Sequence, residues 1–151
     1  MTYQAPVKDM LFVLNHLAGL PTVAALPGFE EATPDTVQAV LEESARFAGD
    51  VLAPLNHPAD LEPSAWRDGA VTTSPGFKQA FRQYAEAGWQ GMTHPVEYGG
   101  QGLPGLIGSP CSEMLNAANL SFALCPLLTN GAIEALMTAG SPALRERYIG
   151  P

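Results

Sequence analysis

The side chains that could act as nucleophiles, bases or metal ligands are few and scattered along this chain. Its 151 residues include two cysteines, Cys111 and Cys125, and three histidines, His16, His57 and His94. No Cys-x-x-Cys pair occurs and the histidines are not spaced as ligands, so we expect no metal site. Such sparse cysteine usage fits a reducing cytosol, with both thiols acting as small buried hydrophobic groups.

The densest cluster of unusual residues is the segment 94–104, with the sequence His-Pro-Val-Glu-Tyr-Gly-Gly-Gln-Gly-Leu-Pro. Three glycines and two prolines in this stretch exclude a continuous helix and require a shaped loop, which is where functional sites are often built. Its glycines do not form the phosphate-binding fingerprint, and no strand precedes them. His94 precedes a proline, which favours a turn residue over a general base. The residues by themselves therefore assign no catalytic group.

Composition excludes several classes of partner. The net charge is −8, from 15 acidic and 7 basic residues, so affinity for nucleic acid or for anionic lipid is not expected. Charged residues make up 15% of the chain, against roughly 25% in an average globular domain. Either part of the surface is covered by another domain or protein, or the surface is polar without being charged. The length fits one domain spanning residues 1–151.

Targeting and membrane segments are not expected. Lys8 and Asp9 interrupt the N-terminal region before the apolar run 10–14, so no secretory signal is predicted. By hydropathy, no segment is expected to reach the roughly 20 apolar residues of a membrane span. The expectation is a cytoplasmic protein without a membrane span.

Hydrophobic residues recur at helical spacing along most of the chain, which predicts an all-α, bundle-like fold. Three Ser/Thr-Pro pairs, beginning at Thr33, Ser74 and Ser141, have the form of capped helix starts. The polar segment 56–73 is expected to be irregular, apart from a short extended piece at 71–72. The predicted helices are 6–17, 34 to about 52 (ending near Pro54), 75–87, 105–119, 121–139 and 142–148.

Two of these helices carry specific expectations. In the helix 105–119, Pro110 either kinks the helix or marks its start, with Ser109 as the cap. The helix 121–139 has one charged residue, Glu134, and is apolar nearly all round. A helix of that kind is expected to be deeply buried.

The loop motif Pro95-x-Glu97-Tyr98-Gly99-Gly100-x-Gly102 resembles a loop near the end of the N-terminal helical domain of acyl-CoA dehydrogenases. The opening, Tyr3-x-Ala5-Pro6-x-x-Asp9-Met10-x-Phe12, is similar to that of the larger bacterial enzymes of this family, the subgroup that includes the methylmercaptopropionyl-CoA dehydrogenases. Further matching motifs follow in the same order over nearly the whole chain: 51–56, 75–78, 88–89, 113–114, 118–119 and 126–132.

The resemblance implies a division of labour between domains. Members of this family combine a helical domain, a β-domain and a second helical domain, and they oxidise an acyl-CoA thioester at its α and β carbons while reducing FAD. The catalytic glutamate lies in the C-terminal helical part, and most flavin contacts come from the other two domains. This chain ends about where the family crosses into the β-domain. The resemblance therefore implies no catalytic residue, no flavin ligand and no FAD bound by this chain alone.

In the full enzyme, the resemblance implies an acyl-CoA substrate, an electron-transfer acceptor, and contacts with the missing domains or with further copies. The helix 121–139 corresponds to one wall of the acyl pocket. Its facing positions are Leu124, Leu127, Leu128 and Gly131, with the small glycine leaving room for the acyl tail. The alternative is that these four residues belong to the core.

Three positions depart from the family pattern. Cys125 stands where close relatives tend to have an aromatic residue, Ala59-Asp60 replaces a Gly-Asp pair, and Pro110 interrupts a helix that usually has no proline. The first leaves the substrate length open. Two other functions also stay open: a catalytically inactive helical interaction module that buries an apolar face against a partner, and a structural domain without a ligand.

Overall fold

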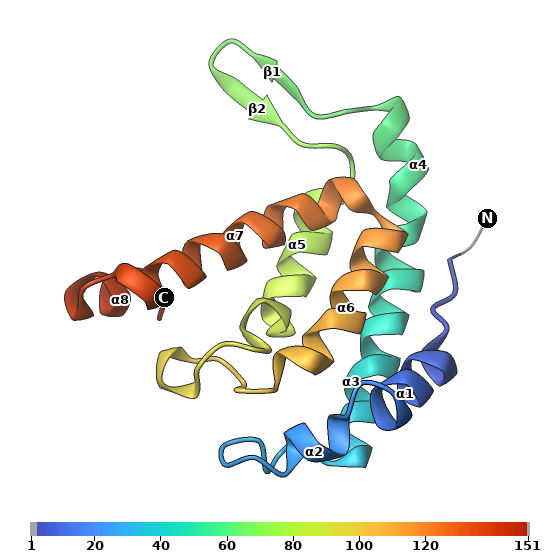
Figure 1. The fold of residues 1–151 in the computed structure, drawn as a ribbon. Coiled ribbons are helices and arrows are strands. Elements are labelled where there is room, and N and C mark those ends of the chain that lie inside the picture. The colour runs from blue at the N-terminus through green and yellow to red at the C-terminus, as the bar shows by residue number, and fades with distance from the viewer. Residues whose placement is uncertain (1–2, 151) are drawn as a thin grey trace.

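The computed structural model describes residues 3–150, and its packed helices confirm the all-α fold (Figure 1). One small hairpin projects from the helical body (Figure 1). The elements in chain order are α1 (Val7–His16), α2 (Leu20–Ala24), α3 (Pro34–Arg46), a π-helical segment (Phe47–Leu52), α4 (Ala53–Leu61), β1 (Ala65–Arg67), β2 (Ala70–Thr72), α5 (Phe77–Glu86), 3₁₀ turns (Trp89–Gly91 and Val96–Tyr98), α6 (Gly105–Ala118), α7 (Leu120–Ala139) and α8 (Pro142–Tyr148).

A continuous helical rod runs from α3 through the π-helical segment into α4. Its start is the predicted one, because the Thr33 hydroxyl accepts a hydrogen bond from the Thr36 N–H at 3.2 Å. The predicted end near Pro54 is wrong. The wider π-helical turn precedes Pro54, which therefore lies in the first turn of α4, where its missing N–H breaks no helical hydrogen bond. The helix consequently continues to Leu61 through residues expected to be irregular.

The core lies where α6 packs across this rod, and α1 packs against both α3 and α6. Burial of each large apolar side chain contributes about 1.5–3 kcal/mol relative to exposure. The largest fully buried apolar side chains are Val37, Leu41, Leu52, Ile107 and Met114.

The segment between α4 and α5 differs from the expectation in two ways. The extended piece at 71–72 is half of a hairpin, in which Trp66 pairs with Val71. Its turn is Asp68-Gly69, with φ values of 50° and 80°, a pair that suits a two-residue hairpin turn. Ser74 does not cap α5, because Gly76 (φ 84°) occupies the N-cap position without a side-chain hydrogen bond.

Of the two alternatives for α6, the structure confirms continuity through Pro110. The helix begins at Gly105, and the proline is buried inside it. Ser109 therefore does not start a helix.

The expectation that α7 is deeply buried is wrong. Only 17% of its most apolar 18-residue window is buried, and the buried residues, Phe122, Ala123 and Pro126, lie near its start. Cys125 is exposed as well, whereas Cys111 is buried as expected. The 20 residues of α7 do reach the length and apolar composition of a membrane span, contrary to the sequence expectation, although core helices of soluble proteins meet the same criterion.

The corner between α6 and α7 is fixed by the side chain of Asn119, which is 1% exposed. Its Oδ1 accepts a hydrogen bond from the Phe122 N–H at 3.1 Å and caps α7. Its Nδ2 donates to the Leu52 carbonyl oxygen at 3.2 Å, at the end of the π-helical segment. One amide therefore satisfies backbone groups on two helices that are distant in sequence.

Replacing Asn119 by Asp should separate these two roles. The carboxylate can still cap α7, but it cannot donate to the buried Leu52 carbonyl, so the free energy of unfolding should fall by about 1–3 kcal/mol in chemical denaturation. Asn116→Asp is the matched control, because Asn116 is exposed and bonds only within α6. Equal effects of the two substitutions would contradict the role given to Asn119.

The glycine-rich segment 94–104 folds into a tight loop that its own backbone closes. The Gln101 N–H donates to the Gly91 carbonyl at 2.9 Å, and the Gly102 N–H donates to the His94 carbonyl at 3.0 Å. Gly100 lies so close to this backbone that a Cβ there would stand 2.1 Å from the His94 oxygen. The loop therefore requires glycine at position 100 for steric reasons.

Gly100→Ala should push the backbone around Gly100 away from the backbone of His94. It should lower the free energy of unfolding by about 1–3 kcal/mol, as overpacking does. Thermal and denaturant unfolding would measure the change. The control is Gly105→Ala, since no atom lies within 4 Å of a Cβ at that position. A Gly100→Ala protein as stable as its control would be incompatible with this account of the loop.

Candidate functional site

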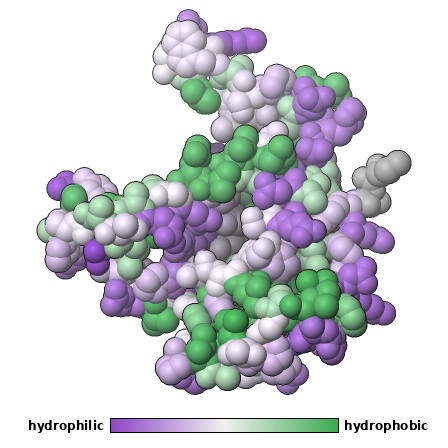
Figure 2. All heavy atoms as spheres, viewed as in Figure 1, coloured by the Kyte–Doolittle hydropathy of each residue, from purple (hydrophilic) through white to green (hydrophobic). Residues whose placement is uncertain are grey.

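The four residues predicted to line an acyl pocket lie on an exposed face of α7. The exposed fractions are 50% for Leu124, 57% for Leu127 and 74% for Leu128. Leu120, one turn before Leu124, is also exposed. A Cβ built at Gly131 meets no atom within 4 Å, so the glycine leaves open space at the end of this leucine row. Figure 2 shows hydrophobic surface gathered over the first half of α7.

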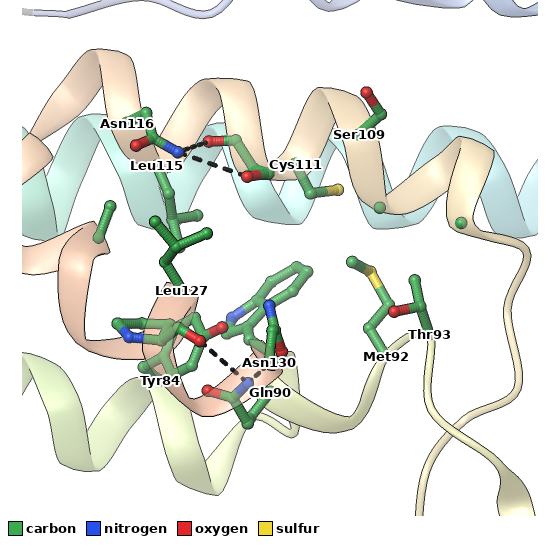
Figure 3. A pocket seen from close by; sticks show the side chains of 16 residues that line it. Tyr84, Gln90, Met92, Thr93, Ser109, Cys111, Leu115, Asn116, Leu127 and Asn130 are labelled. Carbon is green, nitrogen blue, oxygen red and sulfur yellow. Dashed lines mark hydrogen bonds between the residues drawn. The ribbon is translucent and has the colours of Figure 1, made fainter. Parts of the chain in front are cut away.

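A cavity of about 280 Å³ lies between α5, α6 and α7, next to this row, and Leu127 belongs to both. Side chains of α6 form one wall, and the end of α5 with the turn that follows it forms the opposite one (Figure 3). No acidic, basic or histidine side chain lines it. The polar lining residues are Tyr84, Gln90, Thr93, Ser109, Ser112, Asn116 and Asn130.

A polar cluster at the rim of this cavity ties α7 to the start of the glycine-rich loop. Asn130 Oδ1 accepts hydrogen bonds from Gln90 Nε2 and from His94 Nε2, the latter at 3.1 Å. Gln90 Nε2 also lies 3.5 Å from the Pro126 carbonyl oxygen. Figure 3 shows the side chains of Gln90 and Asn130 meeting at the cavity. His94, 8% exposed, is thus held in a structural hydrogen bond.

Tyr84 reaches the cavity from an aromatic cluster. Its ring packs against Phe122 at 5.9 Å between centroids and against Phe47 at 6.2 Å. Burial, with smaller contributions from Cys111 and Cys125, raises the pKa of Tyr84 to about 12. Burial likewise raises the pKa of the Cys111 thiol to about 11, so the thiol stays protonated at neutral pH and is a poor nucleophile. The lining can therefore bind and shape a ligand, but it offers no group suited to acid–base or nucleophilic chemistry.

Sequence reasoning found the leucine row but missed the cavity behind it. Asn130 gave one usable signal, since an amide in an otherwise apolar helix needs a hydrogen-bond partner. Its partners, Gln90 and His94, are 36 to 40 residues away in the chain, and no periodicity indicates such a pairing. Tyr84 lies within the helix predicted over 75–87, and its spacing gave no sign of a cavity.

Comparison with known proteins gives one family match and two similar proteins. Residues 34–151 match the family described as acyl-CoA dehydrogenase, N-terminal domain. The 3-methylmercaptopropionyl-CoA dehydrogenase of Ruegeria pomeroyi is 46% identical over 149 residues, which are 99% of this chain and 25% of that protein. The butyryl-CoA dehydrogenase of Syntrophomonas wolfei is 25% identical over 97% of this chain and 25% of its own length. The chain thus spans about a quarter of the length of these relatives.

The raised pKa values predict a loss of stability at alkaline pH. In the unfolded chain Cys and Tyr ionise near 9 and 10, whereas in the folded chain Cys111 and Tyr84 hold their protons to about 11 and 12. The folded state therefore binds more protons in this window, so the free energy of unfolding falls as the pH rises through it and is unaffected by these groups below it. A titration followed by tyrosinate absorbance would test this. Tyr84→Phe should remove the ionisation step near pH 12, and the control Tyr148→Phe should leave that step in place.

Proposed function

The chain belongs to the acyl-CoA dehydrogenase family, whose N-terminal domain it matches, and we propose that it forms one wall of the acyl pocket in an FAD-dependent enzyme. That enzyme would remove hydrogen from the α and β carbons of an acyl-CoA thioester. In this proposal the leucine row of α7, Leu124, Leu127 and Leu128, contacts the acyl chain, and Gly131 leaves space for it.

The observation that carries the proposal is the exposure of this row. Three leucines that are each at least half exposed on one helix face form a larger apolar surface than isolated exposed residues do. Covering this surface with a hydrocarbon chain and with neighbouring domains removes it from water. Each methylene group buried in this way contributes about 0.8 kcal/mol, so the face is suited to an acyl tail.

FAD is assigned to other parts of the enzyme. The cavity between α5, α6 and α7 has no cationic side chain to pair with a pyrophosphate, and its volume of about 280 Å³ lies just below the range typical of drug-sized ligands. This cavity thus does not fit a dinucleotide. The catalytic base is likewise assigned elsewhere, since no carboxylate lines this cavity.

The same exposed row supports a second function, that of a helical interaction module without catalysis. A partner protein would then cover α7 in place of the acyl chain and the other domains. The two functions differ in the role of Gly131. An acyl pocket needs the open space at this position, so filling it would change which substrate lengths are accepted. A protein interface without catalysis makes no such demand.

The test uses a dehydrogenase assembled by replacing the matching segment of the Ruegeria pomeroyi relative with this chain. Gly131→Leu should fill the space at the end of the row and lower kcat/KM about tenfold for long acyl-CoA substrates relative to the shortest, as expected when about two methylene groups lose their contacts. Ala143→Leu, an exposed small-to-leucine change on α8, is the control. An assembled protein that lacks dehydrogenase activity, or whose chain-length profile ignores Gly131→Leu, would refute the pocket wall.

A further inference from the structure

The second half of α7 has little packing of its own. The helix enters the core through Phe122, Ala123 and Pro126, whereas no residue from 127 to 139 is buried. Figure 1 shows this part of the helix extending past the helical body to α8. Burial in the core therefore does not fix its position, and another interaction has to do so.

Pro126 separates the two halves of the helix. A proline has no N–H, so the hydrogen bond that position 126 would donate to the Phe122 carbonyl is missing, and a helix bends more easily at such a point. Pro126 is also the last buried residue of α7. The helix is thus least constrained where it leaves the core.

Asn130 carries the hydrogen bonds that tie the second half to the rest of the domain. Among the side-chain hydrogen bonds of residues 3–150, those from Gln90 and His94 to Asn130 Oδ1 are the ones that join residues 127–139 to elements before α7. Since Oδ1 is the acceptor, His94 must donate from Nε2. Asn130 directly precedes Gly131 and lies one turn after Leu127, so these bonds act at the proposed pocket surface.

His94 is a donor whose position is already fixed. Its backbone N–H donates to the Gly91 carbonyl at 3.1 Å, and its carbonyl accepts from the Gly102 N–H at 3.0 Å. The residue as a whole is 8% exposed. A side chain that is held by its own loop loses little conformational entropy when it bonds a neighbouring helix. The glycine-rich loop therefore offers α7 a rigid attachment point.

We propose that His94 and Gln90 are positioning residues for the pocket wall. By bonding Asn130 they hold the half of α7 beyond Pro126, and with it Gly131, in the orientation that accepts long acyl chains. This inference rests on the proposed function, and it adds that the glycine-rich loop influences substrate length without contacting the substrate. A wall that is already ordered leaves less ordering for the substrate to bring about, so loosening it should raise KM more than it lowers kcat.

The first test is amide hydrogen exchange in this chain, and His94 allows a matched pair of substitutions. A glutamine amide nitrogen can replace Nε2, whereas the shorter asparagine reaches only the position of Nδ1. His94→Asn should speed exchange over residues 127–139 about fivefold, the effect of one neutral hydrogen bond, and His94→Gln should not. Gln90→Met removes the other donor at a half-buried position and should act like His94→Asn.

Exchange over residues 120–125 is the internal control, because that part of α7 enters the core and should be unaffected. Unchanged exchange over residues 127–139 in Gln90→Met and in folded His94→Asn would overturn the inference, whatever the activity of the enzyme.

The second test uses the assembled dehydrogenase. His94→Asn and Gln90→Met should raise KM about fivefold for long acyl-CoA substrates, leave KM for the shortest unchanged and alter kcat little, whereas His94→Gln should retain the unmodified values. A general structural defect would instead lower kcat for every chain length. If the assembled enzyme is active but the variants affect all lengths alike or none, the positioning role is wrong while the pocket wall stands. If the unmodified assembled enzyme has no activity, the proposed function fails and this inference fails with it.

Discussion

The buried amide of Asn119 is the interaction on which the arrangement of the domain depends. The helices α6 and α7 are separated by this one residue, so its conformation sets the direction in which α7 leaves the core. By bonding the Leu52 carbonyl as well as the first turn of α7, the amide links that direction to the α3–α4 rod. The π-helical segment belongs to the same constraint, because it ends at the carbonyl that Asn119 binds. Such segments interrupt regular helices at a cost, and here the interruption coincides with a long-range hydrogen bond.

The direction given to α7 produces two different faces. Phe122, Ala123 and Pro126 complete the core, whereas the leucine row and Gly131 remain outside it. A sequence that is apolar nearly all round indicates that the helix needs cover on every side. It does not indicate whether that cover is the rest of the chain, a ligand or a neighbouring domain. For this reason deep burial was the wrong expectation for α7, whereas the four positions proposed to line the pocket share one exposed face of the helix.

The same distinction between local and distant information explains what the sequence could predict elsewhere. Capping at Thr33 and Ser141 and the stop at Gly140 are local chemistry, and the structure has all three. The Asp68-Gly69 turn was also a local signal for the hairpin, but the surrounding polar composition concealed it. In contrast, the passage of the rod through Pro54 depends on a π-helical turn that no spacing rule specifies. The cavity is lined by side chains from three helices, so the sequence could not predict it either.

The glycine-rich loop contributes to the candidate site through its shape rather than through reactive groups. Its closure, which requires glycine at position 100, presents His94 to Asn130, and this contact anchors the middle of α7 as Asn119 anchors its start. The stretch of α7 between these two anchors contains Leu124, Leu127 and Leu128, so the leucine row is held at both ends. Around it, Tyr84 and Cys111 keep their protons far above neutral pH. The proposed pocket wall would position a substrate without reacting with it. That role requires fixed geometry and neutral side chains, and the packing of this domain supplies both.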